Sequence, residues 1–198
     1  YLFIENFQSG DDYYMNFYYS SFTRMLRIVS FLLTICVPSI YIAIEAFHHE
    51  MLQTPILINI AAERYNVPLP AALEAFIMLL VFDILRETGI RMPSNIGQAL
   101  SIVGALVIGQ AAVEAKLVAA PMIIVVALTG ITSLLVPRLN PSAIFVRLIL
   151  LALSSILGLF GLILGMAGLI IHLLNLRSCG VPIMEFTGDF SLQNIKDK

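Results

Sequence analysis

Long apolar stretches alternate with short polar ones along this chain, and several of the apolar stretches reach about 20 residues or more. A helix of that length crosses the hydrocarbon core of a bilayer. The pattern therefore predicts an all-α protein, a polytopic transmembrane helix bundle with interfacial amphipathic helices. The predicted spans cover residues 28–46, 95–115, 118–136 and 144–174.

Segments of different character border this bundle. Residues 1–24 contain a cluster of tyrosine and phenylalanine rings, which suit the headgroup layer because their faces are buried while the hydroxyls stay wet. We therefore expect residues 1–24 to form an interfacial segment leading into the membrane. Residues 25–176 then form the bundle, and residues 177–198 form a polar tail.

One predicted helix, residues 71–87, carries charges that make it a poor lipid-facing span. Each charge at the centre of a span costs roughly 2.5 to 3.5 kcal/mol. The helix is therefore expected to lie on the membrane surface as an amphipathic helix, to be re-entrant, or to be sheltered by protein. Asp83 and Arg86 stand three residues apart and could neutralise each other, whereas Glu74 points to the opposite face and needs a separate partner.

Small residues recur along the last apolar stretch at alternating spacings of four and three. As one helix, residues 144–174 would measure about 46 Å, longer than the hydrocarbon core of about 30 Å, and would tilt or protrude. The small residues would share one face and let another helix approach closely. We expect a helix-packing seam, with a pore-flanking or sliding role as the alternative. The seam comprises Ser154, Gly158, Gly161, Gly165 and Gly168.

The predicted span at 95–115 is rich in small and mildly polar residues, unlike an ordinary lipid-facing helix. Polar groups inside a membrane are costly unless they meet partners or water, so they indicate a cavity, a conduction path or a polar helix contact. Packing and permeation are both open, and Glu114 could simply pair with Lys116 at the interface. The pore or gating candidates are Gln98, Ser101, Ala105, Gln110 and Glu114.

The composition agrees with a membrane protein. Hydrophobic residues make up 59% of the chain and charged residues 12%, and the mean hydropathy is +0.93. Soluble domains average about 25% charged residues. Lysine and arginine are spread so evenly that four spans, or five if residues 71–87 cross, fit equally well in either orientation.

The remaining chemistry is sparse. A net charge of -2 without a lysine or arginine run argues against nucleic-acid binding. The two cysteines give no disulfide or metal framework, and His48, His49 and Glu50 lack further spaced ligands. Because no catalytic motif is present either, we predict no enzymatic activity, no cofactor and no metal.

Several motifs in this chain match one known family. The strongest are ILRETGIRMP and, after it, SIVGALVIGQAAVEA at residues 101–115, within a match from Pro68 to Ile131. Weaker ones are DDYY near the start and HLLNLRSCGVP near the end. These motifs resemble the A subunit of the GerA-type germinant receptors of bacterial spores. The family usually carries glutamate where this chain has Leu79 and Asp83.

The resemblance implies a multi-pass subunit of the spore inner membrane that acts with B and C subunits to turn nutrient sensing into ion release. It also implies a ring of copies around a central ion pathway. A soluble domain normally precedes the membrane region in this family, and its absence here leads us to expect the membrane portion alone.

The combined prediction is a homo-oligomeric, nutrient-gated cation channel subunit with residues 95–115 lining the pore. One alternative is a non-conducting scaffold that packs against a transporter-like partner, and another is a related sporulation membrane protein. A secondary transporter working alone is disfavoured, because the hydropathy shows no inverted repeat.

Overall fold

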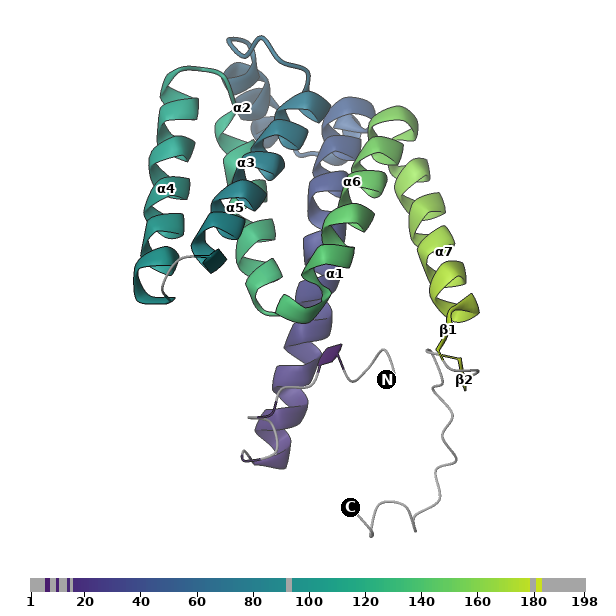
Figure 1. Ribbon diagram of the computed structural model, residues 1–198. Helices are drawn as coiled ribbons and strands as arrows, with labels where there is room; N and C mark the ends of the chain where they lie inside the picture. Colours follow the sequence, from purple (N-terminus) through teal and green to yellow (C-terminus); the bar gives the residue numbers. More distant parts are fainter. Residues whose placement is uncertain are drawn as a thin grey trace.

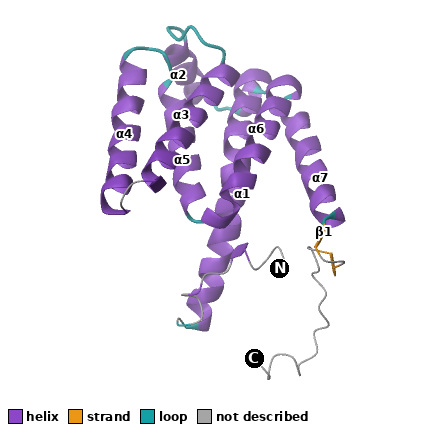
Figure 2. Ribbon diagram, viewed as in Figure 1, coloured by secondary structure: helices purple, strands orange, loops and turns teal. Residues whose placement is uncertain are grey.

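The computed structural model describes residues 6–7, 10, 14, 16–91, 94–178 and 181–182, and α-helices contain most of them (Figure 2). The prediction of an all-α protein is confirmed. The only strands in this part of the chain are β1 and β2, which form a two-residue antiparallel pair after the last helix. The elements are α1 (Phe17–Phe47), η3 (His49–Met51), α2 (Thr54–Arg64), α3 (Ala71–Arg91), α4 (Ser94–Glu114), α5 (Ala120–Leu134), η4 (Pro137–Leu139), α6 (Asn140–Leu157), α7 (Leu159–Asn175), β1 (Arg177–Ser178) and β2 (Val181–Pro182).

Proline sets the start of three helices. Pro55, Pro121 and Pro141 each stand in the first turn of α2, α5 and α6. Proline is favoured there because its fixed φ suits the helix and its missing N–H has no intrahelical acceptor at that position. Pro38, in contrast, lies inside α1, and the helix continues through it for 31 residues in all.

α1 differs from the sequence prediction at its N-terminal end. It begins at Phe17, so residues 17–24, which include Phe17, Tyr18 and Tyr19, belong to the same continuous helix as the predicted first span at 28–46. The helix therefore runs without a break across the boundary expected after residue 24. Most of residues 1–15 lie outside the described ranges.

The prediction of one continuous helix over residues 144–174 is wrong. The stretch is divided into α6 and α7 at Gly158, whose φ of 64° and ψ of -142° are not helical. Glycine reaches this conformation because it has no Cβ. Figure 1 shows α7 running back beside α6, and the two helices pack against each other.

α1 forms the centre of the bundle (Figure 1), packing against α5, α6 and α7. α3 contacts α4, α5, α1 and α6, whereas α4 packs mainly on α3 at the outer edge. The larger apolar core joins α1, α3, α5 and α6. Its buried members are Ile42, Ala75, Met78, Leu79, Val118, Met122, Val126 and Leu151.

Two described helical stretches are long and apolar enough to cross a membrane. They are Phe17–Phe47 and Pro137–Leu157, and the apolar helices α5 and α7 are shorter, at 15 and 17 residues. The surface also exposes many large apolar side chains, including Ile124 at 70% and Ile156 at 71%. Exposed apolar surface of this extent indicates contact with lipid or with other chains.

Candidate functional site

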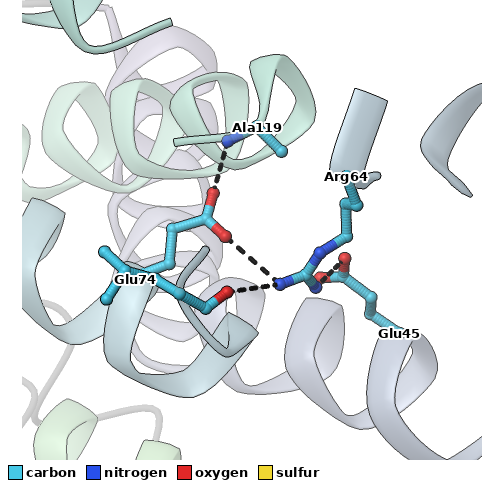
Figure 3. A network of polar contacts seen from close by, with 5 residues as sticks. Glu45, Arg64, Glu74 and Ala119 are labelled. Atoms are coloured by element: carbon cyan, nitrogen blue, oxygen red, sulfur yellow. Dashed lines mark hydrogen bonds and ion pairs between the residues drawn. The ribbon is translucent and has the colours of Figure 1, made fainter. Parts of the chain in front are cut away.

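The first polar site is an ionic cluster at the end of the bundle where α1 ends and α3 begins (Figure 3). The guanidinium of Arg64, the last residue of α2, binds the Glu45 carboxylate from α1. Its Nη2 also donates to Glu74 Oε2 at 3.3 Å and to the Leu69 carbonyl at 3.4 Å. The second oxygen of Glu74 accepts the Ala119 N–H at 2.7 Å. The cluster thus ties α1, α2, α3 and the start of α5 together.

The two carboxylates of this cluster are buried, so they depend on partners within the protein. Glu74 is 1% exposed and Glu45 8%, so two buried carboxylates share one guanidinium, that of the partly exposed Arg64. Ala119 is the N-cap of α5, and the positive end of that helix favours the Glu74 carboxylate. The sequence prediction that Glu74 needs a partner of its own is answered by Arg64 and Ala119.

The second polar site lies farther along α3. Arg147 of α6 is 1% exposed and donates from Nη2 to Asp83 Oδ2 at 2.5 Å. Arg86 donates instead to Ser133 Oγ of α5, at 3.1 Å. Asp83 and Arg86 still attract each other electrostatically, as their spacing predicted, but each makes its hydrogen bond to a different helix. Three charged side chains of α3, Glu74, Asp83 and Arg86, thus contact other helices of the bundle.

The pore candidates lie on the outer helix α4. Ala105 and Gln110 line a groove of about 660 Å³ between α3, α4 and α5, and Gln110 is exposed. Glu114, the last residue of α4, is also exposed. The side chains of Gln98 and Ser101 lie outside what the structure describes. The pore candidates whose side chains are described, Ala105, Gln110 and Glu114, therefore do not form one site within a single chain.

The residues of the predicted packing seam do not share one helix face, because the chain divides into α6 and α7 at Gly158. Each of them therefore has its own contacts. A Cβ on Gly161 would overlap the Leu153 carbonyl, and one on Gly165 would overlap the Leu150 side chain, so both glycines permit close packing of α7 on α6. Ser154 Oγ donates to the Ser39 carbonyl of α1 at 2.6 Å. Gly168 has open space around it.

Glu45, Arg64 and Arg147 are partners that sequence reasoning did not identify. The sequence did indicate that each of these charges needs a partner, because a charge within or beside an apolar stretch must be paired inside the protein. It did not indicate which residue the partner is, because the two members of a pair are 10 to 64 positions apart. Among the described residues, no three histidine, cysteine or acidic side chains are grouped so as to hold a metal.

An all-helical chain with ion pairs buried between helices and two helices of membrane-spanning length fits the class of helical membrane proteins. The chain belongs to the GerA family, because the model of the Bacillus/Clostridium GerA spore germination protein matches it over residues 1–198.

Individual relatives agree with this assignment. The chain is 46% identical to spore germination protein KA of Bacillus subtilis over 99% of its own length and 36% of the relative's. It is 42% identical to the membrane protein YfkQ and 41% identical to spore germination protein A1 of the same bacterium, over 96% of the chain in each case. These matches cover 37% and 40% of the two relatives, so the chain spans well under half of their length. No solved structure matches it.

Proposed function

We propose that this chain is the membrane part of an A-type subunit of a spore germinant receptor, located in the inner membrane of a bacterial spore. The observation that carries the proposal is the family match over the whole chain, together with relatives named spore germination proteins. The two long apolar helices support the membrane location. The subunit would act with B and C subunits.

In this proposal the chain is polytopic. The proposed spans at 28–46 and 118–136 correspond to α1 and α5, and the span at 95–115 corresponds to α4. α6 and α7 take the place of the single span expected at 144–174. α3 lies among the spans. Glu74 and Asp83 form ion pairs with Arg64 of α2 and Arg147 of α6, and Arg86 donates to the Ser133 hydroxyl of α5.

The finer part of the proposal is that copies of the subunit assemble into a ring and conduct cations along α4. α4 packs mainly on α3 and leaves Gln110 and Glu114 exposed, beside exposed apolar residues such as Leu106. A carboxylate facing acyl chains is unfavourable, so burial against a second copy or contact with a water-filled path would stabilise Glu114.

Ion flux tests this assignment. Gln110→Leu and Glu114→Gln should each change cation conductance or selectivity of the reconstituted receptor, because both remove a polar group from the proposed path. Glu63→Gln is the matched control, since it neutralises an exposed glutamate on α2 and should leave flux unchanged. Wild-type flux in both α4 variants would remove α4 from the ion path.

The second candidate is a scaffold subunit that conducts nothing itself. It is favoured by the lining of the groove between α3, α4 and α5, where Arg86 and Gln110 are the polar side chains among apolar ones. A single chain thus offers a poor path for ions in this groove. The oligomeric state in nanodiscs separates the candidates, because a ring favours the channel and a monomer favours the scaffold.

A further inference from the structure

The segment that connects α1 to α3 is only loosely packed on the bundle. It covers residues 48–70 and contains η3 and α2. α2 has no buried residue and packs only sparsely on the other helices. Its aliphatic side chains are largely open, with Ile56 46% and Ile58 61% exposed. Burial of apolar surface therefore contributes little to holding α2 in place.

One side chain joins this segment to the bundle by polar contacts. Among residues 49–69, all of which the structure describes, Arg64 is the only one whose side chain forms a hydrogen bond or an ion pair. Figure 3 shows it reaching from α2 to Glu45 and Glu74. We refer to Glu45, Arg64, Glu74 and the Ala119 N–H as the Arg64 cluster.

The charges of the Arg64 cluster make this single contact strong. Glu45 and Glu74 are both buried, and Arg64 is the only cation among the described residues that forms an ion pair with either of them. Withdrawing Arg64 would leave two buried carboxylates without a counter-charge, which is strongly unfavourable. The docked position of α2 therefore depends on one guanidinium.

The Arg64 cluster also reaches the connection between α4 and α5. Glu74 Oε1 accepts the Ala119 N–H at 2.7 Å. The residues just before Ala119 fold back on the last turn of α4, where the Leu117 N–H donates to the Ala112 carbonyl at 3.0 Å. A displacement of Glu74 would therefore shift the end of α4, at which Glu114 lies.

We propose that residues 48–70 form a strap across this end of the bundle, that Arg64 is its latch, and that release of the latch loosens the connection between α4 and α5. Arg64 is a positioning residue in this device, since it acts through Glu74. Because such coupling is reciprocal, a partner that binds the released α2 would also loosen this connection. The inference rests on the contacts of the Arg64 cluster and does not assume ion conduction.

Distances between spin labels test the latch. Labels are placed at the exposed positions Asn59→Cys on α2 and Ile156→Cys on α6, in the full chain with Cys36 and Cys179 replaced by alanine. Labelled chains are diluted with unlabelled chains in nanodiscs, so that each distance lies within one molecule. We expect a narrow distance distribution with Arg64 present and a broad one in Arg64→Gln. An unchanged narrow distribution in Arg64→Gln overturns the proposal.

Two further variants separate release of the latch from unfolding. The triple variant Arg64→Ala, Glu45→Gln and Glu74→Gln lacks the latch but leaves no buried carboxylate unpaired in the cluster, so it should stay folded and show the broad distribution. Glu63→Gln, which neutralises the exposed glutamate next to Arg64, is the matched control and should keep the narrow distribution. A narrow distribution in the triple variant, or a broad one in Glu63→Gln, contradicts the latch.

Hydrogen exchange tests the coupling. We expect the amides of residues 115–119 to exchange at least about tenfold faster in the triple variant than in the wild type, because Glu74 is then no longer held by Arg64. The amides of α7, which contributes no residue to the Arg64 cluster, should keep their wild-type rates. Unchanged exchange at residues 115–119 overturns the coupling. Equal acceleration in α7 assigns the cluster to fold stability alone and also overturns the proposal.

Discussion

At the scale of single residues, Arg147 is the largest fully buried side chain among the described residues. It stands in the apolar helix α6, is 1% exposed, and reaches Asp83 on α3. A buried ion of this kind is tolerated only with a partner, because the loss of hydration of each charge costs several kcal/mol. The pair therefore specifies how α3 docks on α6, whatever its net effect on stability.

Replacing one member of this pair should destabilise the fold. Asp83→Asn leaves the Arg147 guanidinium buried without a counter-charge, and we expect the free energy of unfolding in detergent to fall by about 3–5 kcal/mol. The double variant Asp83→Leu with Arg147→Met removes both charges and should recover most of that loss. Denaturant unfolding of Asp83→Asn, of the double variant and of its two constituent single variants, Asp83→Leu and Arg147→Met, measures these values. A double variant whose loss of stability equals the sum of the losses of Asp83→Leu and Arg147→Met would show that the pair is not coupled.

At the scale of elements, close backbone approach decides where helices pack. Gly130 of α5 lies directly under the Phe82 ring of α3, where a Cβ would overlap the ring. Gly158 allows the chain to turn between α6 and α7, with the Phe47 side chain 3.0 to 3.1 Å from where its Cβ would be. These positions need glycine for different reasons, although all glycines look alike in the sequence.

Two glycines of α7 give a matched test of the packing between α6 and α7. Gly161→Ala should lower the free energy of unfolding by about 1–3 kcal/mol, because the new methyl meets the Leu153 carbonyl and the helices must separate. Gly168→Ala meets nothing within 4 Å and should stabilise the helix by roughly 0.5–1 kcal/mol. Thermal or denaturant unfolding in detergent measures the difference. Equal effects of the two substitutions would argue against close packing at Gly161.

At the scale of the whole molecule, the Arg64 cluster and the turn between α5 and α6 lie at opposite ends of the bundle (Figure 1). The cluster joins the end of α2 to the starts of α3 and α5. If the chain is polytopic as proposed, these ends face opposite sides of the membrane. The loops at the two ends then differ in their accessibility to reagents that cannot cross the bilayer.

Cysteine labelling tests this arrangement. In a chain with Cys36 and Cys179 replaced by alanine, Asn66→Cys and Arg138→Cys each place one thiol at an exposed position, at opposite ends of the bundle. An impermeant maleimide added to sealed vesicles of one orientation should label one variant strongly and the other weakly. Both should react equally after detergent is added. Equal labelling of both variants in sealed vesicles would contradict a bundle that crosses the membrane between them.

The sequence alone was sufficient to predict the helices from local patterns, the membrane character from the composition, and the family from short motifs. Hydrophobic periodicity and helix-starting prolines act over a few residues, so they are readable without tertiary contacts. The predicted segments 28–46, 71–87 and 95–115 accordingly fall within α1, α3 and α4, apart from one residue at the end of the last. The same patterns also showed that Glu74 must have a partner.

Only the tertiary structure decided which partner each charge takes and where the last apolar stretch turns. Arg64 joins Glu74 across 10 positions and Arg147 joins Asp83 across 64, and such pairings follow from how whole helices dock. The turn at Gly158 has the same origin, because a glycine in an apolar stretch is compatible with a continuing helix. It leaves the helical conformation here, and α7 then packs back on α6, where Gly161 and Gly165 permit close approach.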